Sequence, residues 1–440
     1  MQWNHLLTAL RYGQESKKQP SAFSFRSEFQ RDYDRLIFSS AFRRMQNKTQ
    51  VFPLPGSVFV HNRLTHSLEV ASVGRSLGNM VAEKIAPSEK EKETPALSEL
   101  GTIVSAACLA HDMGNPPFGH SGEKALSAFF SKNTGLQTDF RLSDQQWNDL
   151  IRFEGNANAL RLLTHQYRGW RHGGFSLTYS TLASLIKYPY SSVSEISAKK
   201  YGYFHSEQQT FRQIEERLQI PSDANGNGTR HPLVYLVEAA DDISYLIMDL
   251  EDAHKLGIIG YQETRELLIT FQNQDQLSHT EEVFREVSDR NEQISYLRAI
   301  AINVLANACT EVFMEHYIDI MAGTFSGSLV GYLPETLKES LKKLRSTGFD
   351  KIYKHRKVIE IELAGFNILG TLVEEFISAL PGKTKYQENI LSLVPRQYDV
   401  SAEDPYERIR AIIDYISGMT DVYALEIYRN IKGIEMPSLR

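Results

Sequence analysis

The chain has 440 residues, of which 42% are hydrophobic and 23% charged. That composition is typical of a globular protein with one large core or two to three domains. The net charge of −6 argues against a general polyanion binder, although it leaves room for a local basic pocket. Only two cysteines occur, Cys108 and Cys309. They predict no disulfide framework and a reducing, cytoplasmic location.

The N-terminus has no signal-peptide pattern, and no run approaches the roughly 20 apolar residues that a membrane span needs. We therefore expect no membrane partner. Helical periodicity dominates instead, with apolar residues three and four positions apart, and it predicts an all-α fold. The predicted helices cover residues 64–85, 234–256, 293–313, 366–380 and 408–431, with a shorter one inside 175–190.

Three polar stretches are predicted to be loops, at residues 86–99, 191–209 and 221–232. The third has the strongest cluster of Gly, Asn and Pro, and we interpret it as a surface loop before a helix. A domain boundary is expected near residues 255–262, because the chain loses its His and Asp clusters after that point.

The apolar helix pattern before residue 111 ends in an adjacent imidazole and carboxylate, His111 and Asp112. A C-terminal helix cap would explain His111. It does not explain Asp112, because a carboxylate at a helix C-terminus faces an unfavourable dipole and is costly to bury unpaired. A divalent metal removes this difficulty, since it accepts both kinds of ligand. His66 lies early in a predicted core helix and is a second imidazole of this kind.

A further ligand is expected from the helix at 234–256. Asp241, Tyr245 and Asp249 are spaced four apart, so they drift only about 40° over two turns and share one face. Asp242 points to another face. The alternative interpretation is a charged stripe that faces solvent, which serves equally well for Asp249 alone. It suits the set less well, because Ala239 and Ile243 keep the helix near the core.

His120 and Glu123 follow a stiff Pro-Pro-Phe-Gly segment and lie three apart at a predicted helix start. Residues three apart on a helix are neighbours, and a carboxylate beside an imidazole orients it and raises its basicity. This pair is therefore a candidate general acid or base. Glu123 could instead simply stabilise the helix by its negative charge near the N-terminus. That alternative does not explain why a stiff Pro-Pro-Phe-Gly segment precedes His120.

Cationic candidates complete the set. Arg63 lies three residues before His66, and Lys187 and Tyr188 form a basic–aromatic pair before a proline. Together with a metal they suggest a phosphorylated substrate. The sequence has no P-loop and no GxGxxG motif, so a Walker-type or Rossmann nucleotide site is unsupported.

Longer motifs then carry a resemblance that covers most of the chain. They include HNRLTHSLEV, AHDMGNPPFGHSGE, RFEGNANALRLL and EAADDISYLIMDLEDA, and later KHRKVIEIELAGF and IDYISGMTDVYALEIY. In these segments the chain resembles the HD-domain metal phosphohydrolases, and among them the deoxyguanosinetriphosphate triphosphohydrolase family. It departs from the animal relatives at Asn115, where they have a further His, so any role of that His does not transfer.

The resemblance implies a role for each matched residue. The metal ligands would be His66, His111, Asp112 and Asp241, and the catalytic His would be His120 with Glu123 as its acidic partner. Substrate contacts would come from Arg63, Asn156, Lys187, Tyr188, Tyr245 and Asp249. The ion would be one divalent metal per site, Mg or Mn, with Co, Ni, Fe or Zn as alternatives.

The implied activity is hydrolysis of a dNTP, dGTP included, to the deoxynucleoside and tripolyphosphate. The alternatives are another HD-domain nucleotide phosphohydrolase, or a non-catalytic nucleotide sensor or single-stranded nucleic-acid binder. Family members are often hexamers and some bind nucleic acid, so we expect a homo-oligomer. The implied domains are an N-terminal helical segment (1–58), the HD domain (59–257) and a helical C-terminal phosphohydrolase-associated domain (258–440).

Overall fold

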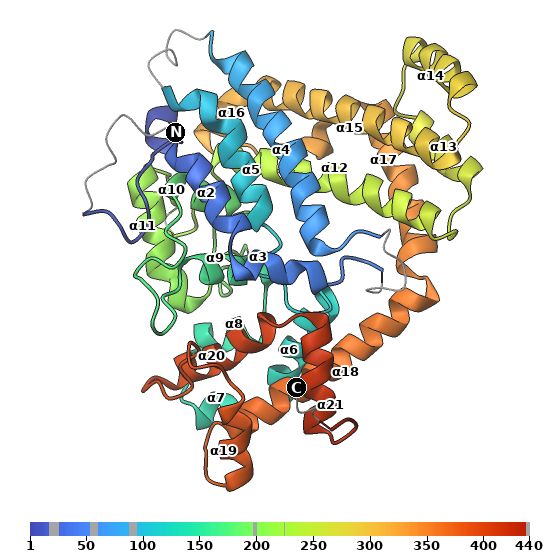
Figure 1. Ribbon diagram of the computed structural model, residues 1–440. Coiled ribbons are helices and arrows are strands. Elements are labelled where there is room, and N and C mark those ends of the chain that lie inside the picture. Colours follow the sequence, from blue (N-terminus) through green and yellow to red (C-terminus); the bar gives the residue numbers. More distant parts are fainter. Residues whose placement is uncertain (17–25, 53–59, 88–94, 197–199, 224, 437–440) are drawn as a thin grey trace.

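The computed structural model describes residues 1–16, 26–52, 60–87, 95–196, 200–223 and 225–436. In these residues every regular element is a helix, and extended pairing is limited to four isolated bridges. The predicted all-α fold is therefore confirmed. The helices form two groups, an upper and a lower one in Figure 1, and each group surrounds its own hydrophobic core.

The first core is built by the upper group. Its α-helices are α1 (Trp3–Leu6), α2 (Glu28–Ile37), α3 (Ser40–Arg44), α4 (Arg63–Ile85), α5 (Leu100–Ala110), α10 (Tyr179–Leu185), α11 (Gln208–Leu218), α12 (Pro232–Lys255), α13 (Tyr261–Ile269), α14 (Gln274–Glu286), α15 (Arg290–Glu315), α16 (Tyr317–Ala322) and α17 (Glu335–Thr347). Short turns accompany them: η1 (Met45–Asn47), η2 (Pro95–Glu99), η4 (Leu329–Tyr332) and the π-helical η5 (Gly348–Tyr353).

The second core joins residues far apart in the sequence. Its helices are α6 (His120–Lys132), α7 (Gly135–Asp139), α8 (Asp144–Ile151), α18 (Arg356–Ala379), α19 (Lys385–Ser392), α20 (Pro405–Ser417) and α21 (Asp421–Ile431), with η3 (His205–Glu207) beside them. Helix α9 (Gly155–Thr164) contributes to both cores. Figure 1 shows α18 descending from the upper group and running past α6.

The predicted helices are found, but some of their ends differ. The predictions at 64–85, 234–256 and 293–313 match α4, α12 and α15 within a few residues. The pattern at 366–380 is only the second half of α18, which begins at Arg356. The single helix predicted over 408–431 was wrong, because α20 ends at Ser417 and α21 begins at Asp421 with Thr420 as its N-cap.

Two of the three predicted loops are shorter than expected, and the third is found as predicted. The stretch 86–99 contains η2, and its residues 88–94 lie outside the described part of the chain. In 191–209 the chain is already helical from His205, and residues 197–199 are not described. The stretch 221–232 is a loop up to the start of α12, apart from residue 224, which is not described.

Helix α15 is the one described helix that is long and apolar enough, by length and composition alone, to cross a membrane. Its inward side includes Leu297, Leu305 and Phe313, which belong to the first core, and it packs against α12 and α4. A core helix passes the same composition test, and these contacts place α15 in the core.

Close packing of α4 on α5 brings the candidate ligands together. A Cβ on Gly78 of α4 would lie 2.7 Å from the Cα of Gly101 on α5, closer than real Cβ atoms come. A Cβ on Gly74 would lie 2.5 Å from the Sγ of Cys108. Glycine at these positions lets the two helix backbones approach closely. Helix α12 packs against both helices, and its middle faces the N-terminal end of α4 and the C-terminal end of α5.

Candidate active site

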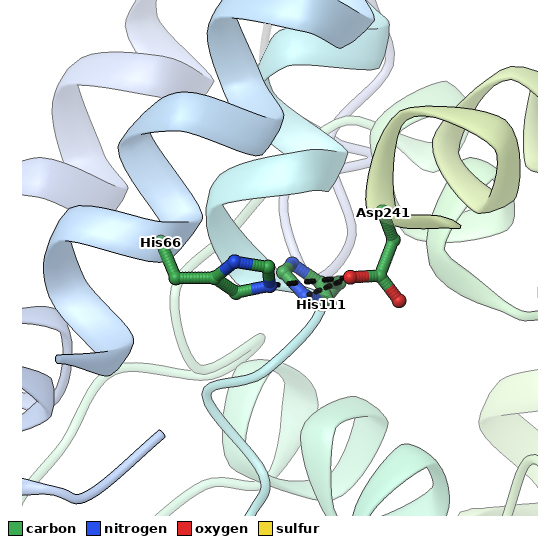
Figure 2. A group of neighbouring side chains, drawn as sticks. All are labelled: His66, His111 and Asp241. Carbon is green, nitrogen blue, oxygen red and sulfur yellow. Dashed lines mark hydrogen bonds and ion pairs between the residues drawn. The ribbon is translucent and has the colours of Figure 1, made fainter. Parts of the chain in front are cut away.

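Three side chains from three helices converge on one point (Figure 2). His66 comes from α4, His111 follows the last turn of α5, and Asp241 comes from the middle of α12. The Oδ1 of Asp241 lies 3.2 Å from the Nε2 of His66 and 3.5 Å from the Nε2 of His111. All three atoms lie within 4.8 Å of one another. These separations suit neighbouring ligands of one ion with bonds of roughly 2.0–2.2 Å.

Hydrogen bonding fixes the ring of His111 and leaves one of its nitrogens without a partner. Its Nδ1 donates to the carbonyl oxygen of Cys108 at 2.6 Å, which fixes the tautomer because a carbonyl only accepts. Its Nε2 is buried and has no hydrogen-bond partner among the described residues. A buried polar atom without a partner is costly, and an ion between the three side chains would satisfy it. The residues therefore fit a divalent metal.

The charges of the three side chains are strongly coupled. Burial lowers the pKa of His111, but the carboxylates of Asp112 and Asp241 outweigh burial and raise it to about 9. Burial alone would raise the pKa of Asp241, yet His111 and His66 hold it well below its usual range. A metal ion bound here would therefore have to displace the proton from His111.

Asp112 occupies a different position from the other three predicted ligands. Its Oδ2 accepts a hydrogen bond from the Nη1 of Arg63 at 2.5 Å, and its Oδ1 accepts one from the side chain of Asn115. The Oδ1 also lies 3.7 Å from the Nε2 of His111. Burial raises the pKa of Asp112, but Arg63 and His111 hold it low. Its role as a fourth ligand stays a prediction.

His120 and Glu123 form the expected pair at the start of α6. The Nδ1 of His120 lies 2.7 Å from the Oε2 of Glu123, and the other carboxylate oxygen accepts from the backbone N–H of Gly155 at 2.8 Å. Glu123 is buried, whereas the side chain of His120 is 74% exposed toward the cavity. Burial raises the pKa of Glu123, but His120 and Lys200 outweigh burial and hold the pKa below its usual value, so the carboxylate stays ionised.

These groups line one cavity of about 480 Å³. Most of the predicted site residues face it, namely Arg63, His111, Asp112, His120, Glu123, Asn156, Lys187, Tyr188, Asp241 and Tyr245. His66 does not line the cavity, but it contacts Asp241, which does. Asp249 does not line this cavity.

Asp249 lines a second cavity of about 340 Å³, between α12, α17 and η5. The two cavities share Asp242, Tyr245 and Tyr353. The rings of Tyr245 and Tyr353 are stacked, with centroids 6.0 Å apart, and the hydroxyl of Tyr353 donates to Asp249 at 2.7 Å. Burial raises the pKa of Asp249 to about 7, although this hydrogen bond opposes the change.

Carboxylates hold the predicted cations of the cavity. The Nζ of Lys187 lies 3.0 Å from Glu238, which also binds Arg230 at 3.1 Å. Burial lowers the pKa of Lys187, but Glu238 raises it above its usual value. Arg63 is held by Asp112 as described above. Lys187 therefore stays charged at the wall of the cavity.

The sequence analysis missed a third cation, Lys200. Its Nζ lies 2.9 Å from Glu154, which also accepts from the side chain of Asn156 at 2.6 Å. Glu123 and Glu154 raise the pKa of Lys200 against the effect of burial. The residue lies in a polar segment without periodicity, and nothing in its spacing indicates a site.

Two models of known protein families match the chain. The HD domain model matches residues 63–152, which include Arg63, His66, His111, Asp112, His120 and Glu123. The model of the phosphohydrolase-associated domain matches residues 332–430.

Full-length relatives extend the match over the whole chain. A deoxyguanosinetriphosphate triphosphohydrolase-like protein of Synechocystis is 37% identical and covers 99% of this chain and 100% of its own length. One of Pseudomonas aeruginosa is 38% identical over the full length of both. The deoxyguanosinetriphosphate triphosphohydrolase of Cronobacter sakazakii is 30% identical over 92% of this chain and 94% of its own. The chain belongs to the HD-domain hydrolases of the deoxyguanosinetriphosphate triphosphohydrolase-like family.

Proposed function

We propose that this protein uses one divalent metal ion to hydrolyse deoxynucleoside triphosphates, dGTP included, to a deoxynucleoside and tripolyphosphate. One observation carries the proposal. A single cavity is lined by His111 and Asp241 of the His–His–Asp cluster, by the His120–Glu123 pair and by the cations of Arg63, Lys187 and Lys200. The names of the relatives support the substrate class. Mg or Mn is the proposed ion, with Co, Ni, Fe or Zn as alternatives.

His66, His111 and Asp241 would hold the ion, with Asp112 as the proposed fourth ligand. The bound ion would supply Lewis-acid stabilisation of the charge that develops on the reacting phosphate. Because the ionised Glu123 only accepts hydrogen bonds, the Nδ1 of His120 carries its hydrogen. The Nε2 of His120 is then the atom that exchanges a proton with the attacking water or the leaving oxygen.

The phosphates would be held by Arg63, Lys187, Lys200 and Tyr188. Arg63 offers a fork of donors, and the lysines act as point charges. Tyr245 is proposed to abut the sugar and Asn156 to line the site, with Asp249 behind Tyr245. A homo-oligomer, a hexamer as in many family members, remains a prediction, as do nucleic-acid binding and a cytoplasmic location.

The test incubates the manganese-loaded protein with the four dNTPs, singly and mixed, and separates the products by chromatography. We expect deoxynucleoside and tripolyphosphate from wild type, and a loss of at least about a hundredfold in His120→Ala. The matched control is His279→Ala. In wild type this exposed imidazole lies 3.5 Å from Glu282, which follows it by three residues on α14 just as Glu123 follows His120 on α6. His279 does not line the cavity, so the variant should leave turnover unchanged.

Other outcomes separate the alternatives. Orthophosphate or pyrophosphate as the product would contradict the proposal and indicate another HD-domain nucleotide phosphohydrolase. No turnover in the mixture, even with manganese, would favour a nucleotide sensor or a single-stranded nucleic-acid binder.

A further inference from the structure

The segment that delivers His120 contains a strained turn. Between α5 and α6 the backbone of Phe118 has φ +59°, in the left-handed region, and Gly119 follows with φ +56°. Glycine adopts that conformation at little cost, but a phenylalanine does not. A non-glycine residue stays in such a conformation only where its surroundings hold it. The structure must therefore contain groups that fix this turn, directly before His120.

The carboxylate of Asp421 is the group that bonds to the strained residue. Its Oδ1 accepts the backbone N–H of Phe118 at 3.0 Å, and its Oδ2 accepts the backbone N–H of Thr49 at 2.8 Å. Asp421 is buried, with 6% of its surface exposed. It lies some 300 positions after Phe118 in the chain, at the first residue of α21. One side chain of the C-terminal region thus holds two backbone segments that line the cavity.

Capping of its own helix does not explain Asp421. The N-cap of α21 is Thr420, whose side chain accepts from the N–H of Tyr423 at 3.1 Å. Both oxygens of Asp421 bond instead to segments outside α21. A carboxylate at a helix N-terminus also interacts favourably with the helix dipole.

Neighbouring contacts hold the same segment at a second point. The Nζ of Lys48 donates to the carbonyl oxygen of Asn115 at 2.6 Å and to that of Ser417 at 2.8 Å. The side chain of Asn158 donates to the carbonyl oxygen of Gly114 at 2.7 Å. These bonds fix the beginning of the segment, whereas Asp421 is the side chain that bonds to its strained end.

We propose that Asp421 is a positioning residue for His120, and that its carboxylate fixes the turn at Phe118 and Gly119 from which His120 projects. The inference rests on the proposed function for the role of His120. It gives the junction of α20 and α21 a part in a site whose metal cluster comes from helices of the first core. Asp421 itself does not line the cavity.

The test compares Asp421→Asn with Asp404→Asn in the full-length, manganese-loaded protein. The Asp421→Asn change replaces one of the two acceptor oxygens by an NH2 group, which only donates and cannot accept from the backbone N–H that it would face. Asp404 is the N-cap of α20 and accepts from Tyr406 at 2.9 Å without touching the segment, so it controls for helix capping. We expect kcat to fall about tenfold to a hundredfold in Asp421→Asn, because small displacements of a catalytic group cost that much. KM and the manganese dissociation constant should stay within about threefold of wild type.

Hydrogen–deuterium exchange supplies a readout that does not need turnover. The peptide covering residues 112–122 should exchange at least about tenfold faster in Asp421→Asn than in wild type or Asp404→Asn. Asp421→Glu is a second variant. It keeps the charge at the start of α21, but its longer side chain cannot place the carboxylate at both N–H groups. It should therefore lower kcat while its melting temperature stays near that of wild type.

The outcomes are separable. Unchanged exchange and unchanged kcat in Asp421→Asn would overturn the proposal. Unfolding of both Asp421 variants below the assay temperature would also overturn it, because Asp421 would then serve overall stability. If wild type hydrolyses no dNTP, the proposed function fails. Faster exchange of the segment in Asp421→Asn would still support the positioning role in that case.

Discussion

A histidine that the sequence analysis did not single out, His61, links the two helices that carry Asp241 and His66. Its Nδ1 lies 2.7 Å from Asp252 at the end of α12, and its Nε2 lies 2.9 Å from Glu69 on α4. Its backbone N–H donates to Asp252 as well, at 2.7 Å. Burial lowers the pKa of His61, but the hydrogen bonds to the two carboxylates outweigh burial and raise it to about 10. We predict that replacing His61 with Asn removes a pH-dependent part of the stability.

The magnitude follows from the change in pKa. The pKa rises from 6.5 to about 10, and each unit of pKa corresponds to about 1.4 kcal/mol, so the contribution of His61 to the free energy of unfolding is at most about 5 kcal/mol. Glu69 is 29% exposed, so solvent screens part of its interaction, and we expect about 2–4 kcal/mol. The folded-state pKa is the higher one. The stabilisation is therefore complete below pH 6.5 and is lost as the pH rises toward 10.

The assay is urea unfolding of wild type and His61→Asn at several pH values from 6 to 9.5. The free energy of unfolding should differ most at pH 6, and the difference should shrink steadily as the pH rises. Subtracting the two proteins removes the other groups that titrate in this range, such as the buried Lys48, whose pKa burial lowers to about 7. The variant His279→Asn, at an exposed site, should show no such difference. A difference for His61→Asn that does not change with pH would refute the reasoning.

Three further predictions concern the site. Asp241→Asn should weaken manganese binding at least about a hundredfold by titration calorimetry, whereas Asp242→Asn should change it less than about threefold. The manganese affinity of wild type should rise about tenfold per pH unit from 6 to 8, because the ion displaces a proton from His111, whose pKa is about 9. Glu123→Gln should lower kcat by about a hundredfold to ten-thousandfold in steady-state kinetics, with manganese affinity unchanged. A normal kcat in that variant would exclude Glu123 as the partner of His120.

The sequence predicted the parts of the site that local spacing controls. The four-residue spacing of Asp241 and Tyr245 places both on the cavity side of α12, as helical geometry requires. The His120–Glu123 pair likewise follows from a three-residue spacing at a helix start. Asp249 lies two turns beyond Asp241 and does not line this cavity. There the cavity ends at the stacked Tyr245 and Tyr353, so the side chain faces the second cavity.

Contacts between segments far apart in the chain could not be predicted from local sequence patterns. Lys200 has no periodic pattern around it, and the apolar pattern around Asp421 does not single that residue out. The roles of both arise from partners that only the fold brings near. His61 lies in the quoted motif HNRLTHSLEV, but its partner Asp252 follows 191 positions later. The break between α20 and α21 was missed for a related reason. The apolar spacing continues across it, and the turn is stabilised by tertiary contacts of Ser417 and Asp421.

The division of the site between two cores has a consequence for how substitutions should act. His66, His111 and Asp241 come from helices of the first core, whereas His120 and Glu123 belong to α6, which packs on α18 in the second. The short segment between α5 and α6 connects the two sets, and Lys48, Asn158 and Asp421 hold it. Changes inside the first core should weaken metal binding and turnover together. Changes at α18, α20 or α21 that shift α6 should lower turnover and leave metal affinity intact, because they move His120 relative to a metal cluster that stays formed.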